Sequence, residues 1–164
     1  MDGTLLTLPC TLADFESAGL AVSITSPMEL ENGQYWLNWQ AVKPGNDSGY
    51  ISGSAYCDTA TPSASQVKIN QCSANVTYQE DVPFSVVLPG NIAWGSSTID
   101  RAIEAYGEPD DSIVLEKDGV TSYFWYVDPS VKDDAGYLNL GAYNDSKVIE
   151  HIGIGCPGNS GSSS

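Results

Sequence analysis

The sequence is poor in basic residues and in long apolar runs. Its 164 residues include 6 Lys and Arg against 21 Asp and Glu, a formal net charge of -15. This negative charge repels phosphate backbones and anionic lipid, so we expect no nucleic acid as a partner and no attraction to a membrane surface. No apolar stretch approaches the roughly 18 residues that a membrane-spanning helix requires, so no membrane span is predicted.

Signal features are also missing from the start of the chain, where residues 1–4 form neither a basic nor an apolar region. The cysteine content described next nevertheless indicates export. We therefore expect a leader that is absent from this sequence, and an extracellular or cell-surface location.

Histidine residues, which commonly bind metal ions, are few, and the sequence contains no C-x-x-C pair. The chain has 1 His, and its 4 cysteines are Cys10, Cys57, Cys72 and Cys156. We therefore expect no metal and no cofactor, and disulfides formed outside the cytosol. Of the three possible pairings we favour Cys57 with Cys72, because neighbouring strands joined by a loop are predicted there, which leaves Cys10 and Cys156 near the chain ends. Buried reduced cysteines are the alternative.

What the sequence does have is enough apolar material for a core, with 41% hydrophobic residues. Residues 11–19 predict a short helix: Thr11 can cap it, Asp14 stands at capping-box spacing, and Gly19 suits the position after the end. Residues 97–107 repeat this pattern with Ser97, Asp100 and Gly107.

Alternating apolar segments after each helix predict strands, at residues 35–41, 50–56 and 67–78 after the first and 112–116, 120–127, 137–143 and 147–154 after the second. Between two of them, Asp118-Gly119 predicts a two-residue hairpin turn. Strands with such short connections pair antiparallel.

The order of elements predicts an α+β protein of two tandem modules, each a short capped helix packed on an antiparallel β-sheet meander. We place the N-terminal module at residues 1–82 and the C-terminal module at 83–156. The Gly/Ser-rich residues 157–164 are expected to form a flexible tail.

Three segments resemble a known family. Residues 92–100 (IAWGSSTID), 105–110 (AYGEPD) and 123–126 (YFWY) resemble the signature of the helix-plus-sheet modules found in outer-membrane-assembly lipoproteins and in the β-lactamase inhibitor protein. The N-terminal half is similar to exported or lipoprotein-type, uncharacterised proteins of Gram-positive bacteria that carry this module. The resemblance implies a non-enzymatic protein-binding or envelope role. The chain lacks the lipidation cysteine of the anchored relatives, so lipid anchoring stays open.

Catalytic material is sparse. His151 lies on a predicted strand and is the one His that could serve as a general base for a serine or cysteine nucleophile. Asp128, Asp133 and Asp134 share a loop, but their spacing does not match an EF-hand. Three Asn-x-Ser/Thr triplets fit the pattern of N-glycosylation sites, but we interpret them as turns. We therefore predict that the protein is not an enzyme.

Tryptophan and tyrosine are the richest binding material, with 4 Trp and 9 Tyr. Trp36 and Trp39 are three apart, so in a strand they point to opposite faces. We predict a non-catalytic, exported protein-interaction or cell-envelope module whose partner is an unknown protein or envelope component. The alternative is a carbohydrate-binding module that uses Trp36 or Trp39 as a platform; a ring rimmed by apolar neighbours favours protein, and a ring flanked by polar ones favours sugar.

Overall fold

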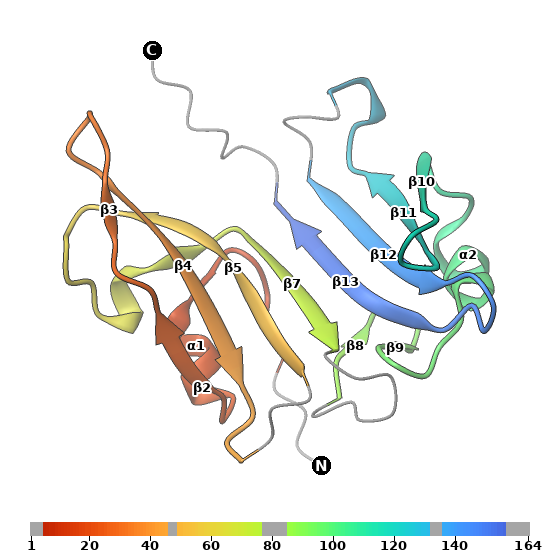
Figure 1. The fold of residues 1–164 in the computed structure, drawn as a ribbon, viewed down its shortest axis with the longest axis horizontal. Helices are drawn as coiled ribbons and strands as arrows, with labels where there is room; N and C mark the ends of the chain where they lie inside the picture. The colour runs from red at the N-terminus through yellow and green to blue at the C-terminus, as the bar shows by residue number, and fades with distance from the viewer. Residues whose placement is uncertain (1–4, 46–48, 77–84, 132–135, 157–164) are drawn as a thin grey trace.

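The computed structural model describes residues 5–45, 49–76, 85–131 and 136–156. The main element of these residues is one antiparallel sheet of nine strands (Figure 1). Its spatial order is β10 (Asp111–Leu115), β11 (Val120–Tyr126), β12 (Tyr137–Tyr143), β13 (Ile149–Gly155), β7 (Gln71–Val76), β5 (Gly49–Cys57), β4 (Tyr35–Val42) and β2 (Ala21–Ile24), with β3 (Met28–Glu29) also paired to β4. Two further pairs, β1 (Cys10–Thr11) with β6 (Lys68–Ile69) and β8 (Val87–Leu88) with β9 (Ile92–Ala93), stand apart from it.

The two halves of the chain meet at the pairing of β7 with β13. This ladder runs from His151 opposite Asn75 to Gly155 opposite Gln71, and Figure 1 shows the two strands side by side between the N-terminal and C-terminal strands. The mostly antiparallel β architecture with two short helices is compatible with the predicted α+β class. The two expected sheet layers, however, form one continuous sheet, and their expected boundary near residue 82 lies outside the described residues.

Both helices cover the same face of this sheet. Cross-strand partners point to one face, and the register carries that face across the sheet through the pairs Trp39 and Gly53, Ile51 and Ala74, Ala74 and Ile152, Ile152 and Leu140, and Leu140 and Tyr123. Phe15 of α1 (Leu12–Ser17) contacts Trp39, with ring centroids 5.0 Å apart. Tyr106 of α2 (Ile99–Tyr106) contacts Trp125, two residues beyond Tyr123, at 6.0 Å. We call the opposite side, on which no described helix packs, the open face.

The first helix begins and ends as predicted. The Asp14 carboxylate accepts hydrogen bonds from the Thr11 backbone N–H at 2.7 Å and from the Thr11 hydroxyl at 2.8 Å. These bonds hold the pKa of Asp14 below its ordinary value. Gly19 has φ of 84° just beyond the helix, a conformation that favours glycine. Leu12 and Phe15 are fully buried and fix the helix to the covered face.

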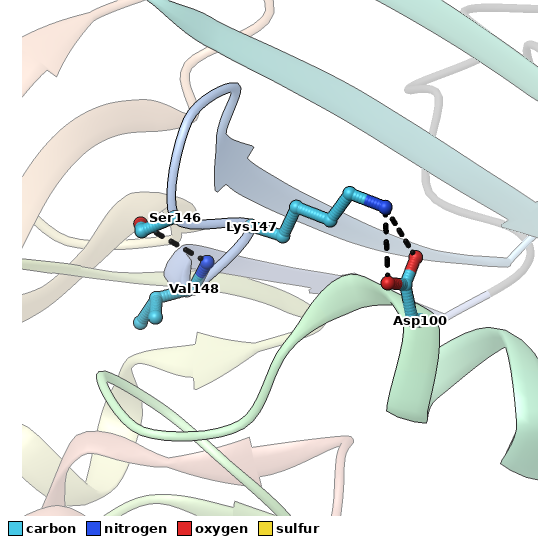
Figure 2. A network of polar contacts seen from close by, with 4 residues as sticks. All are labelled: Asp100, Ser146, Lys147 and Val148. Carbon is cyan, nitrogen blue, oxygen red and sulfur yellow. Dashed lines mark hydrogen bonds and ion pairs between the residues drawn. The ribbon is translucent and has the colours of Figure 1, made fainter.

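The second helix differs from the prediction at its start. Its N-cap is Thr98 and not Ser97, because the Ser97 hydroxyl accepts a hydrogen bond from the Ala93 N–H at 2.9 Å and is held in the preceding turn. The Asp100 carboxylate instead accepts hydrogen bonds from the Lys147 ammonium group, at 3.1 Å through Oδ1 and at 3.0 Å through Oδ2 (Figure 2). The helix start is therefore tied to the turn between β12 and β13. Gly107, with φ of 86°, ends the helix as predicted.

A glycine in β5 makes room for the largest core side chain. A Cβ at Gly53 would lie 2.9 Å from the Gln71 carbonyl oxygen and 3.2 Å from the Trp39 indole nitrogen. The indole therefore lies over Gly53, between β5 and α1, where Trp39 is 2% exposed. Its N–H has no hydrogen-bond partner among the described residues.

The hairpin between β10 and β11 was predicted incorrectly. The pairing ends with Leu115 opposite Val120, so the loop is residues 116–119 and not the two residues Asp118-Gly119. The predicted strand 67–78 is divided into β6 and β7. Five short strands, β1, β2, β3, β8 and β9, were not predicted. The tail 157–164 and the acidic residues Asp133 and Asp134 lie outside the described residues.

Candidate functional site

The open face combines aromatic rings with small uncharged polar groups. Alternate residues of each strand point to it, so its members follow from the register. The aromatic members are Trp36, Tyr50, Tyr56, Phe124, Tyr126 and Tyr137. The polar members of the N-terminal strands are Asn38, Gln40, Ser52, Ser54, Gln71 and Ser73.

Trp36 lies in an apolar row across three strands. Its cross-strand partners are Met28 on β3 and Tyr56 on β5. Met28 is 55% exposed and Tyr56 is 47% exposed, while Trp36 is half-buried between them. We call these three residues the Trp36 row. Because the indole is rimmed by apolar neighbours, the row has the character of a protein contact more than of a sugar platform.

The Trp39 ring is not available as a binding platform. It points to the covered face, contacts Phe15 and is buried. The prediction that either tryptophan could serve as a binding platform was therefore wrong for Trp39. The three-residue spacing correctly indicated opposite faces but not which of the two was covered.

A second aromatic group stands on the C-terminal strands. The rings of Phe124 and Tyr126 are stacked with centroids 6.0 Å apart and an interplanar angle of 6°. Tyr137 is the cross-strand partner of Tyr126, and its ring lies over Gly155, where a Cβ would be 2.5 Å from a ring carbon. We call Phe124, Tyr126 and Tyr137 the C-terminal aromatic cluster.

His151 lies on the open face at the central strand β13, in a position with little room. Its Nε2 is 3.3 Å, and the Ser73 hydroxyl oxygen 3.5 Å, from where a Gly153 Cβ would stand. Burial lowers the pKa of His151 below its ordinary value of 6.5, so the imidazole is neutral at pH 7. His151 therefore contributes a polar, uncharged group to this face.

One carboxylate reaches the same region through a bulge in β13. The register shifts at Gly141 and Ala142, and Glu150 places a carboxylate oxygen 3.1 Å from where a Gly141 Cβ would stand. Burial, and secondarily the charge of Asp118, raises the pKa of Glu150. Ionisation of this carboxyl is therefore disfavoured where it lies.

Acidic residues are otherwise rare on the open face. The chain has 21 Asp and Glu, yet among the described strand residues the register turns only Asp111, on the outermost strand, and Glu150, at the bulge, toward this side. Most of the acidic residues therefore lie outside the open-face positions of the described strands. Aromatic enrichment with depletion of charge is the composition that distinguishes the centre of a protein interface from ordinary surface.

A shallow pocket of about 290 Å³ interrupts this face beside the Trp36 row. It is lined by Ser23, Thr25, Asn38, Trp39, Gln40, Tyr50 and Ser52. The Asn38 side-chain oxygen accepts a hydrogen bond from the Ser54 hydroxyl at 2.8 Å. Hydroxyl and amide groups at the wall of a pocket can orient a small polar ligand.

The cysteines are not arranged as predicted. The β5–β7 register reaches Ser52 opposite Ser73, so Cys72 stands beside Gly53, four residues along the strand from Cys57. Four residues of strand span about 13 Å, beyond the reach of a disulfide. The favoured pairing of Cys57 with Cys72 was therefore wrong, because β5 extends past the end of its pairing with β7.

Among the described residues, no group of three or more His, Cys, Asp and Glu side chains is placed to hold a metal ion. No helix in the same part of the chain has the length and apolar character needed to cross a membrane.

Sequence alone missed Met28, Tyr56 and the C-terminal aromatic cluster as members of one surface. The predicted strands already indicated which alternate side chains share a face. The pairing of β7 with β13, which places the faces of both halves on one side, is not visible in the sequence. Comparison of the chain with known protein families, curated proteins and solved structures gave no match. The resemblance to lipoprotein and β-lactamase-inhibitor modules stays a prediction.

Proposed function

We propose that the open face binds another protein, and that the chain is a non-catalytic interaction module acting outside the cell or at the cell surface. The observation that carries this proposal is the gathering of aromatic side chains on an almost uncharged face of a chain whose net charge is -15. The predicted modules 1–82 and 83–156 would each supply one part of that face, the Trp36 row and the C-terminal aromatic cluster.

The gathering of exposed aromatic side chains on one face is unfavourable for a protein without a partner, which favours a functional reason for it. Exposed apolar and aromatic groups gathered on one side promote association, so a purely solvated face would be expected to carry part of the chain's abundant charge. Tryptophan and tyrosine are also the residues that most often dominate binding energy at interfaces. The Trp36 row offers one such anchor and the C-terminal aromatic cluster offers another.

Charge indicates the kind of partner. An acidic molecule with a neutral binding face is best matched by a protein that presents an apolar centre within a basic surrounding surface. Such a pair associates faster at low salt, because long-range attraction acts before contact. The partner class that we propose is therefore a basic or basically rimmed protein.

The second candidate is a carbohydrate ligand, favoured by the pocket beside the Trp36 row. Its Asn38 and Gln40 amides and its Ser52 hydroxyl are groups that hydrogen-bond sugar hydroxyls. In that case, the Trp36 ring would be the stacking platform and the pocket would supply specificity.

Capture from envelope and secreted fractions of the source organism and its host tests both candidates. Immobilised wild-type protein is compared with Trp36→Ala, Phe124→Ala and the control Val114→Ala, an exposed side chain (59%) whose register directs it to the other side of the sheet. We expect protease-sensitive material that is retained by the control and lost in both open-face variants. The captured protein is then purified, and its affinity is expected to fall as salt rises.

Two other results would contradict the proposal that the open face binds a protein. Protease-resistant glycan that is lost in Trp36→Ala and in Asn38→Ala would establish the carbohydrate candidate. Material retained equally by all variants would show that the open face is not the binding surface.

A further inference from the structure

Three of the four cysteines converge at one place on the covered side of the sheet. Cys72 in β7 is the cross-strand partner of Ile154 in β13. Cys156 follows β13, and its N–H donates to the Asn70 carbonyl at 2.9 Å. It therefore stands diagonally across from Cys72 on the same face, where Cα atoms are typically about 7 to 8 Å apart.

Cys10 reaches the same place from the N-terminal segment. Its strand β1 pairs with β6, and Cys10 lies opposite Ile69, the residue next to Asn70. Cys10 and Cys72 both pack against the core cluster. The proximity of the three thiols is also reflected in their electrostatics. Cys156 contributes to the raised pKa of Cys10, and Cys10 and Cys156 both contribute to the raised pKa of Cys72.

Cys57 is separate from this group. It lies at the far end of β5, buried, with its Sγ 3.3 Å from the Thr59 carbonyl oxygen. A disulfide between Cys57 and Cys72 would require movement of β5 or β7, because the two cysteines are about four strand residues apart. The fold thus divides the cysteines into three neighbours and one isolated thiol.

We propose that Cys10 and Cys156 form the disulfide of this protein, joining the N-terminal strand to the end of β13, while Cys72 and Cys57 stay thiols. All three thiols of the group are partly exposed, but Cys72 lies within the nine-stranded sheet, in β7 between β13 and β5, whereas Cys10 and Cys156 lie outside the strands of that sheet, where a soluble oxidant reaches them first. They also lie 146 positions apart in the chain, so the bond closes nearly the whole described fold into one loop.

The oxidation balances with a small-molecule disulfide such as oxidised glutathione. The Cys156 thiolate attacks one sulfur of that disulfide, which breaks its S–S bond and releases one glutathione thiolate. The Cys10 thiolate then attacks the Cys156 sulfur of the mixed disulfide and releases the second glutathione. Two protein thiols are oxidised, one glutathione disulfide is reduced, and the two protons end on the released thiols.

Burial makes the order of these steps specific. It raises the pKa of Cys10 to about 11 and that of Cys72 to about 12, and the Asp14 carboxylate adds to the shift of Cys10. Both thiols are therefore poor first nucleophiles at neutral pH. Cys156 is expected to form the first mixed disulfide, and Cys72 is expected to be the slowest thiol of the group to react.

The pairing can be read directly from peptides of the oxidised protein. The reduced full-length chain is oxidised with glutathione disulfide, the remaining thiols are alkylated after unfolding, and the product is cleaved before aspartate. Asp14, Asp47, Asp58 and Asp145 place each cysteine in a different peptide. We expect a peptide pair linked through Cys10 and Cys156, with alkylated Cys57 and Cys72.

Variants provide a second measurement. Cys57→Ser and Cys72→Ser should keep the linked peptides, whereas Cys10→Ser and Cys156→Ser should lose them. Reduction of the wild type is expected to lower its Tm by roughly 10 °C, because the closed loop is long, and to leave the Tm of Cys10→Ser unchanged. A link through Cys57 or Cys72, a bond between two chains, or four alkylated cysteines after oxidation would overturn the assignment.

Discussion

The two faces of the sheet are made from alternate residues of the same strands, yet they carry different chemistry. In β4, Leu37 and Trp39 point to the covered face and are buried, whereas Trp36 and Asn38 point to the open face. The covered face is apolar and filled by two helices. The open face mixes rings with hydroxyl and amide groups, and few of its described strand positions carry an acidic residue.

This difference indicates how stability and binding are separated in the molecule. A buried ring on the covered face excludes water and fills volume, so its removal leaves a cavity. A half-buried ring on the open face has lost only part of its contact with water, so more of its potential stabilisation is still available to a partner. Substitutions on the two faces should therefore separate folding from binding.

The largest expected effect is on the covered face. Trp39→Ala removes a ring that is 2% exposed and packed against Phe15, so we expect a loss of about 3 to 5 kcal/mol in the free energy of unfolding, measured by urea denaturation. Trp39→Phe should cost less, because the indole N–H has no hydrogen-bond partner among the described residues. Equal losses in the two variants would contradict this account of the core.

A smaller effect compares glycines on the two faces. In Gly53→Ala the new Cβ would meet the Gln71 backbone oxygen at 2.9 Å, and that atom cannot move without the strand. We expect a loss of about 1 to 3 kcal/mol, measured by thermal unfolding. In Gly155→Ala the Cβ would meet the ring of Tyr137 on the open face, and that ring can swing away from the sheet.

Gly155→Ala should therefore destabilise less than Gly53→Ala while weakening capture of the partner, since it displaces one ring of the C-terminal aromatic cluster. The opposite order of stability would show that Tyr137 is held as firmly as a core side chain. That result would remove the main distinction between the two faces.

Much of the fold could be predicted from local signals, and the site only in part. The capping pattern of Thr11 and Asp14 and the alternation along β4 are local, and both appear in the structure. The pairing of β7 with β13 joins segments about 80 positions apart and leaves no local pattern. The open face depends on that pairing, so Trp36 could be proposed from sequence but its combination with Phe124 could not.

The cysteines show the same limit. Cys57 and Cys72 are close in sequence, and the expected hairpin would have brought them together. The actual register places Cys72 beside Gly53 instead. Ser52 pairs with Ser73, and beyond that point β5 pairs with β4 as far as Cys57 opposite Tyr35. Register across long loops is set by packing of the covered face, which Trp39 and Ile51 share.

The open face should also respond to pH through His151. Burial lowers its pKa in the folded protein below the ordinary 6.5, so the unfolded chain binds the proton first as the pH falls. The contribution of His151 to the free energy of unfolding is fully present above pH 6.5 and is lost as the pH decreases through the folded pKa. Glu150 has a raised pKa and acts in the opposite direction, losing stability as the pH rises through its folded value.

We therefore compare the Tm of wild type and His151→Asn between about pH 7.5 and about pH 5.5. The wild type should lose a few degrees more than the variant over this interval. Any constant loss from the substitution itself cancels in this difference. Identical pH dependence would mean that the imidazole titrates as it does in the unfolded chain, and so is not desolvated on this face.

The smallest expected effect on stability is that of Trp36→Ala. The ring is half-buried, and its cross-strand contacts with Met28 and Tyr56 are of a kind that contributes about 0.2 to 1 kcal/mol each. We expect the free energy of unfolding to fall by about 1 kcal/mol or less, several times less than in Trp39→Ala, while capture of the partner is lost. Tyr56→Ala is the matched variant, because it removes the neighbouring ring of the same row. If Trp36→Ala unfolded the protein as severely as Trp39→Ala, the indole would be part of the core, and the open face would lose its anchor as a binding surface.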